Sequence, residues 1–220
     1  MKIHTYLNDP PKTPYAPAWN FSFGWSTLPL KVNNLALTCL SKEKKIKKLP
    51  LTYDERGKYN DGYTGLGKNS TTARFAEYNV LEWDTPETNL LKKYVKIKVR
   101  EYNKLLGNDT PDYLWARCWV NILRWGQKIN AHMHTLKSES YLSAHFTVQA
   151  DNTSTCYMNP INVLNDPEII SEENVPGVFS IFPSYVPHYT TRHYSFKPRI
   201  TIAMDIYIEN DENRGSAILL

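Results

Sequence analysis

The sequence has few cysteines and no long hydrophobic run. Cys39, Cys118 and Cys156 lie far apart among 220 residues, and their odd number and wide spacing argue against a disulfide framework and against a C-x-x-C metal site. No stretch approaches the length of a membrane span, and the first residues contain no apolar segment typical of a secretory signal. We therefore expect a soluble protein, located in the cytoplasm, with no membrane partner.

A strong excess of one charge is also absent. The net charge is only +4, so the composition allows nucleic-acid binding without requiring it. The strongest local charge is the lysine-rich run at residues 42–48. Because no aromatic residues interleave with these lysines, we expect a solvated loop rather than a surface that follows phosphates. The 41% hydrophobic content is that of a folded globular chain, long enough to bury a sizeable core.

One helix can be located from its ends. Thr85 is suited to the N-cap and Pro86 to the first helical position. Apolar residues follow at helical spacing until Gly107, a residue that commonly ends helices. The pattern predicts a helix over residues 86–106, with its many lysines facing solvent.

After this helix the hydrophobic period changes to two, which is typical of strands. Short strand-like segments separated by turn-rich residues predict a double-sheet jelly roll. The strand-like segments are residues 113–126, 141–150, 155–160, 177–183 and 199–208. The fold class we expect is α+β, mainly β: a double-stranded β-helix with a flanking helix and an extended N-terminal region.

The N-terminal part is less regular. Residues 32–40 have strand-like apolar content, although a short helix is the alternative. Residues 54–72 crowd glycine, asparagine and aspartate together and indicate a long loop. We expect residues 1–74 to form an extension that packs on the core, and residues 75–220 to form the jelly-roll domain.

Two of the six histidines, His132 and His134, are one residue apart in a strand-like stretch. In a strand, residues i and i+2 point to the same face, about 7 Å apart along the backbone, so both imidazoles can bind one metal ion. The alternative is an accidental pair at the surface or in the core. His188 follows an apolar strand and its turn, and a third ligand from a neighbouring strand would complete a facial triad with three open positions. We expect His4 and His193 at the surface.

Arg199 begins a strand 11 residues after His188, with Thr201 on the same face. If this strand lies beside the segment of His188, the guanidinium points into the same cavity. A buried arginine is costly unless an anion pairs with it, and its planar fork binds a carboxylate bidentately. A dicarboxylate that chelates the metal at one end and contacts Arg199 at the other would satisfy this pattern. The alternative places Arg199 at the rim.

Several of these segments together resemble a family of iron(II)/2-oxoglutarate oxygenases often carried by tailed phages, especially marine ones. The resemblance covers roughly residues 75–208, and its most specific part is the run F-P-S…H…R-I-T. It implies that His132, His134 and His188 bind Fe(II), and that Arg199 and Thr201 hold the distal carboxylate of 2-oxoglutarate. It also implies a phage-encoded enzyme that hydroxylates an unknown substrate. The segments that carry the resemblance are residues 119–134, 141–148, 157–160, 176–191 and 197–206.

This chain departs from the family pattern at several positions. Ala144 stands where the family usually has glycine, and His134 stands where most 2-oxoglutarate oxygenases have Asp or Glu. The run G-x5-H-x-H-x4-E at residues 126–139 also resembles the first motif of the cupins, which would make Glu139 a fourth ligand. Both families are double-stranded β-helices, so the fold expected is the same. Arg199 favours the oxygenase, because a cupin does not need it.

Three further residues are candidates for orienting a ligand or the substrate. Asn130 shares a face with the His132 and His134 pair, and Tyr157 and His145 lie on predicted core strands. The alternative for each is a hydrogen-bonded polar group of the core. A second function class is a non-catalytic virion or assembly protein on the same jelly roll, with a homodimer as one arrangement. If the protein is viral, its location is the host cytoplasm or the virion.

Overall fold

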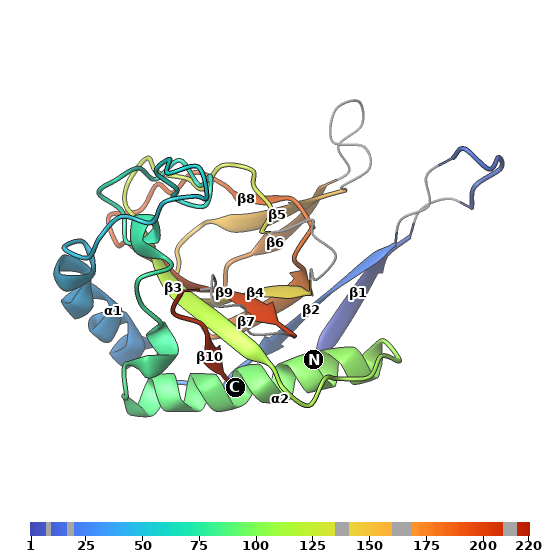
Figure 1. Cartoon of the computed structure of the whole chain (residues 1–220), viewed down its shortest axis with the longest axis horizontal. Coiled ribbons are helices and arrows are strands. Elements are labelled where there is room, and N and C mark those ends of the chain that lie inside the picture. The colour runs from blue at the N-terminus through green and yellow to red at the C-terminus, as the bar shows by residue number, and fades with distance from the viewer. Residues whose placement is uncertain (8–9, 17–19, 135–140, 160–168, 209–214) are drawn as a thin grey trace.

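The computed structural model of the chain describes residues 1–7, 10–16, 20–134, 141–159, 169–208 and 215–220. Two antiparallel sheets dominate it (Figure 1). The large sheet has seven strands in the order β1-β2-β7-β4-β9-β3-β10, and the small sheet has three in the order β6-β5-β8. This arrangement confirms the predicted mainly-β class. No helix of the described residues is both long and apolar enough to cross a membrane.

Five strands, β3, β4, β5, β7 and β9, form at the predicted segments, while β1, β2, β6, β8 and β10 were not predicted. The large sheet consists of β1 (Lys2–Tyr6), β2 (Phe21–Thr27), β3 (Trp115–Leu123), β4 (Leu142–Gln149), β7 (Val178–Pro183), β9 (Arg199–Tyr207) and β10 (Ile218–Leu219). The small sheet consists of β5 (Ser154–Met158), β6 (Ile169–Glu173) and β8 (His188–Thr190). Two short 3-10 helices, η1 (Thr72–Arg74) and η2 (Val80–Glu82), lie in the connection that leads to the long helix.

The long helix α2 (Pro86–Leu105) forms where it was predicted. The Thr85 side chain accepts a hydrogen bond from the Thr88 amide at 3.2 Å, and the Thr88 side chain accepts one from the Thr85 amide at 3.0 Å. This capping box satisfies two amides that the helix itself leaves free. Gly107, with a positive φ of 73°, follows the last turn.

Helix α1 (Val32–Ile46) corrects two expectations. Residues 32–40 are helical rather than extended, and the lysine-rich run belongs to the same helix rather than to a loop. The reason is burial at helical spacing, since Leu35, Cys39 and Ile46 are all buried in the main core. Their contacts with the sheet outweigh the weak local signal.

The two faces of the large sheet have different partners. Ile200, Ile202 and Met204 of β9 belong to the core that also contains the buried residues of α1 and α2. Figure 1 shows α2 running along this outer side, with the small sheet on the other. Alternate residues of β9, including Arg199 and Thr201, therefore face the space between the two sheets. That space is where a double-stranded β-helix places its ligands.

The N-terminal residues take part in the large sheet. β1 pairs with β2, and β2 pairs with β7. The division of the chain after residue 74 stays a prediction, while the strands on both sides of it share one sheet. Residues 54–72 form the predicted long irregular segment, which ends in η1. The three cysteines are free and buried, as expected from their spacing.

Candidate metal centre

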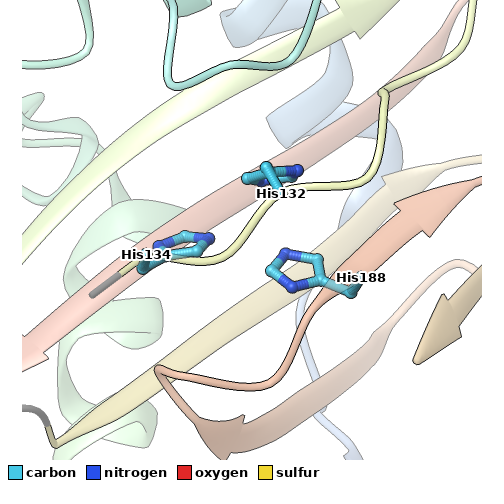
Figure 2. A group of neighbouring side chains, drawn as sticks. All are labelled: His132, His134 and His188. Atoms are coloured by element: carbon cyan, nitrogen blue, oxygen red, sulfur yellow. The ribbon is translucent and has the colours of Figure 1, made fainter. Parts of the chain in front are cut away.

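His132, His134 and His188 converge on one point. One ring nitrogen from each lies within 4.8 Å of the corresponding atoms of the other two. Figure 2 shows the three rings turned toward one another, two from the loop after β3 and one from the start of β8. The pair does not lie in a regular strand, which corrects the expectation. Instead, His132 forms a single bridge with His188, with N···O distances of 3.0 and 2.9 Å.

The hydrogen bonds of the three rings leave the same atom of each ring available. His132 Nδ1 lies 2.9 Å from the Asn130 carbonyl oxygen, and His188 Nδ1 lies 3.0 Å from the Val186 carbonyl oxygen. A carbonyl only accepts, so both Nδ1 atoms carry the proton and both Nε2 atoms keep a lone pair. His134 Nδ1 donates to the Asp205 carboxylate in the same way. Three Nε2 lone pairs are therefore directed at one site, as in metal-binding histidines.

Burial keeps His132 and His188 neutral. It lowers the pKa of His132 to about 4, with a further contribution from the positive charge His134 would carry. Burial and the two neighbouring rings also hold the pKa of His188 well below its usual range. A metal ion therefore does not need to displace protons from these two rings at neutral pH.

These lowered pKa values predict that the metal-free protein loses stability in mild acid. Between the unfolded value near 6.5 and the lower folded values, the unfolded chain binds more protons, so stability falls as pH falls. In this window, each of His132 and His188 lowers the free energy of unfolding by up to about 1.4 kcal/mol for each unit that the pH falls. Urea unfolding of the metal-free protein at pH 7 and pH 5 measures the effect. His4→Ala, at an exposed site, should leave it unchanged, and equal stability at both pH values would contradict the prediction.

Asp205 lies behind His134 and was not among the predicted site residues. It is 8% exposed and accepts hydrogen bonds from Arg117 Nη2 at 2.8 Å and from the Tyr207 hydroxyl at 3.0 Å. Burial alone would raise its pKa, but the charges and hydrogen bonds of His134 and Arg117 hold it below its usual range. Arg117 and Asp205 are direct partners on β3 and β9. The signal in the sequence was that Asp205 shares the face of Arg199 and Thr201 at even spacing.

Arg199 lies inside the barrel rather than at its rim. Its side chain is 2% exposed, and Nη1 lies 3.4 Å from the Thr201 hydroxyl. Among the described residues, no carboxylate lies within ion-pair distance of it, and its Nε has no hydrogen-bond partner. Burial lowers the pKa of Arg199 to about 10, so it remains charged at neutral pH. A buried cation without an anion is costly, and this one is therefore suited to an anionic ligand.

His145 and Tyr157 lie near both the histidine cluster and Arg199. The Tyr157 ring, which is fully buried, lies 6.2 Å from the His188 ring and 6.4 Å from the His145 ring. Burial lowers the pKa of His145 to about 3, and the nearby charge of Arg199 adds to this. Burial likewise raises the pKa of Tyr157. Both rings are neutral and form walls of the space between the two sheets.

Asn130 contributes to the site through its backbone rather than its side chain. Asn130 contributes its backbone carbonyl to His132, while its side chain packs against Gly65. A Cβ on Gly65 would lie 2.2 Å from Asn130 Nδ2, so only glycine allows this contact. Glu139, the fourth ligand of the cupin alternative, lies outside the described residues.

A cavity of about 590 Å³ opens onto the histidines. It is lined by His132, His134 and Asp205, by the aromatic rings of Phe75 and Trp119, and by residues from 52 to 64 of the long loop. The Trp119 ring lies 5.7 Å from the His134 ring. The site thus has an open approach on the cavity side and a buried cation on the other.

Comparisons with known proteins support the fold. No protein-family model and no curated protein sequence matches the chain. Among solved structures it is similar to a Pseudomonas putida prolyl-4-hydroxylase, with 14% identity, a TM-score of 0.53, and coverage of 86% of this chain and 93% of that one. A Trichoplax adhaerens prolyl hydroxylase, in complex with a peptide of hypoxia inducible factor, has 12% identity and a TM-score of 0.58, with 87% and 84% covered.

A third similar structure is the epimerase SnoN from nogalamycin biosynthesis, in complex with Fe³⁺, α-ketoglutarate and a nogalamycin derivative. It has 10% identity and a TM-score of 0.51, with 84% of this chain and 78% of that one covered. At these identities the likeness establishes the fold. The chain is a double-stranded β-helix of the kind that 2-oxoglutarate oxygenases have.

Proposed function

We propose that the protein is an Fe(II)- and 2-oxoglutarate-dependent oxygenase that hydroxylates a substrate bound in the 590 Å³ cavity. The observation that carries this proposal is Arg199, a buried guanidinium with no carboxylate partner among the described residues, inside the same barrel as three converging histidines. Metal binding alone would not require this cation. A ligand that offers one end to the metal and a carboxylate to the arginine accounts for both features.

The donor set fits a transition metal with open coordination positions. Three imidazole nitrogens suit Fe(II), as they also suit Zn, Cu and Ni, and they leave positions for a chelating ligand. The three imidazoles bring no formal negative charge, unlike the Asp or Glu usual in this superfamily. Asp205 supplies one immediately behind His134. This carboxylate–histidine–metal arrangement orients the ring and makes it a stronger ligand.

The second end of the ligand would be held by Arg199 and Thr201. The arginine fork can donate two parallel hydrogen bonds to a carboxylate, and the Thr201 hydroxyl can donate a third. Tyr157, which is fully buried, lies near both Arg199 and His188 and would help exclude water from this region. Once bound, Fe(II) and 2-oxoglutarate would activate dioxygen, the oxidant, with 2-oxoglutarate oxidised to succinate and carbon dioxide, while the chain would supply ligands and orientation.

Two readings of the same fold compete with this proposal. A cupin-type three-histidine metalloprotein would bind the metal without needing Arg199. A virion or assembly protein would keep the barrel without catalytic turnover. A phage origin, a homodimer and virion or assembly partners stay predictions. The buried arginine favours the enzyme. In a purely structural protein a buried cation without an anion would lower the stability of the fold and serve no purpose.

The test is anaerobic titration of the purified protein with Fe(II) and then 2-oxoglutarate, followed by visible absorption. We expect a metal-to-ligand charge-transfer band in the wild type and in His4→Ala, the exposed-histidine control. His188→Ala should show no band, because the triad loses a ligand. Iron binding without a band would favour the cupin-type metalloprotein. Failure of the wild type to bind iron would overturn the enzyme proposal.

A further inference from the structure

Two loops at one end of the barrel are joined by backbone hydrogen bonds. Residues 124–128 follow β3, and residues 192–197 lead into β9. The Gly126 amide donates to the His193 carbonyl at 2.7 Å, and the His193 amide donates to the Gln127 carbonyl at 2.9 Å. The His193 ring, expected at the surface, is fully buried and its Nε2 lies 2.7 Å from the Lys197 carbonyl oxygen. We call these segments the paired loops.

The paired loops present three aromatic rings to solvent. Trp125 is 55% exposed, Tyr194 61% and Phe196 96%. The Phe196 ring stacks on the Trp125 ring with centroids 5.1 Å apart and planes 24° apart, and the Tyr194 ring meets the Trp125 ring edge-on at 5.5 Å. Contiguous exposed aromatics mark interaction sites rather than ordinary surface. Since the buried His193 fixes the loop beneath them, the rings are held in place before a partner arrives.

The paired loops also carry positive charge and no acidic residue. Their cations are Arg124, Lys128, Arg192 and Lys197. Arg124 joins them to α1, because both its Nη atoms contact the Glu43 carboxylate, at 2.9 and 2.7 Å, and Lys47 contacts the same carboxylate at 2.6 Å. The single charge of Glu43 is shared by two cations. Lys47, at the end of α1, therefore adds a cation beside the paired loops.

A concave site lies at this junction. A cavity of about 380 Å³ is lined by Lys47 and Arg124, by Trp125, and by polar side chains including Ser70, Thr71 and Gln127. An aromatic face thus adjoins a polar hollow with two cations. No aromatic residue interleaves with the lysine-rich run in sequence, but the fold brings Trp125 beside Lys47 at its end.

We propose that the paired loops and the end of α1 form a binding surface for single-stranded nucleic acid. Bases stack on exposed aromatic rings in a sequence-tolerant way, and the backbone follows neighbouring cations. The hollow beside Trp125 offers a place for a phosphate or ribose between Lys47 and Arg124. An anionic membrane would instead favour a protruding apolar tip without a polar hollow. The proposal does not depend on the metal centre or on the proposed oxygenase activity.

The test is fluorescence anisotropy of a labelled single-stranded oligothymidylate with the full chain at low and moderate salt. We expect binding that weakens about ten-fold or more in Trp125→Ala and in Phe196→Ala, because each removes a stacking face. The pair Arg192→Glu and Lys197→Glu should reduce both the affinity and its salt dependence. His188→Ala should bind like the wild type, which separates this site from the metal centre.

Matched controls lie on other surfaces of the molecule. Tyr113→Ala removes an aromatic ring that is 70% exposed and outside the paired loops, and Lys92→Glu with Lys93→Glu reverses two charges on α2. Neither control should weaken binding as the loop variants do. Equal loss in the control and loop variants would overturn the proposal, because it would show binding by net charge alone. Binding to vesicles of anionic lipid but not to the oligonucleotide would overturn it in favour of a membrane surface.

Discussion

Arg199→Met is expected to weaken 2-oxoglutarate binding by about a hundred-fold or more, while metal binding is retained. The buried fork has no carboxylate of its own among the described residues, so a bound dicarboxylate would be its counter-ion. Removing one partner of a buried, hydrogen-bonded charge pair costs about 2 to 5 kcal/mol. Isothermal titration of the Mn(II)- or Fe(II)-loaded protein under anaerobic conditions measures the change.

The same variant is expected to stabilise the ligand-free protein. A buried unpaired cation opposes folding, and an apolar side chain of similar length removes that cost, for a gain of about 1 to 4 kcal/mol. Urea unfolding of the ligand-free proteins measures it. Together, higher stability and lost 2-oxoglutarate affinity would identify Arg199 as a residue that binds 2-oxoglutarate and destabilises the ligand-free protein. Arg199→Lys, which keeps the charge but loses the fork, should bind 2-oxoglutarate with intermediate affinity.

If Arg199→Met left the affinity for 2-oxoglutarate unchanged, the carboxylate would have to bind elsewhere. A destabilised ligand-free variant would likewise show that the guanidinium is already paired in the free protein. Either result would remove the main support for the proposed co-substrate. Neither would affect the histidine cluster, whose test is metal binding by His188→Ala.

The elements with strong local signals could be predicted from the sequence. The cap at Thr85 and the apolar stripe located α2, and the strand-like segments located β3, β4, β5, β7 and β9 but not β6, β8 or β10. α1 could not be located, because its first half has strand-like apolar content, its second half is rich in lysine, and its helical state depends on packing in the main core. β1 and β2 were also missed, since the N-terminal residues show little alternation and gain their pairing from β7.

The candidate site was predictable to the extent that its residues follow strand spacing. His132 and His134, and then Arg199 and Thr201, are each two residues apart, so their shared direction could be inferred. The loop geometry that carries the histidine pair could not, because it depends on the bridge between His132 and His188. Asp205 was missed because its role depends on two other segments, β3 and the histidine loop. The basic aromatic surface of the paired loops was missed for the same reason, because it is formed by segments that are far apart in the sequence.

Asp205→Asn is expected to weaken metal binding by about 10- to 100-fold. The asparagine keeps the shape of the side chain and an oxygen that can accept from His134 Nδ1, but it removes the negative charge behind the ring. It also leaves Arg117 beside a neutral partner in a largely buried site, so the free energy of unfolding should fall by about 3 to 5 kcal/mol. Titration with Co(II), followed by its visible absorption, measures the affinity and reports the geometry of the ligands.

The effect on the metal can be separated from the effect on folding by a second substitution. In Asp205→Asn with Arg117→Met, the buried cation is gone, so stability should recover in part while metal affinity stays low. Tyr207→Phe is the matched control: it removes a 3.0 Å hydrogen bond to Asp205 without changing any charge, and should alter Co(II) affinity little. If metal affinity instead recovered together with stability in the double variant, Asp205 would act only by holding β9 against β3. Low affinity in a refolded, stable double variant would establish that the carboxylate acts on the metal through His134.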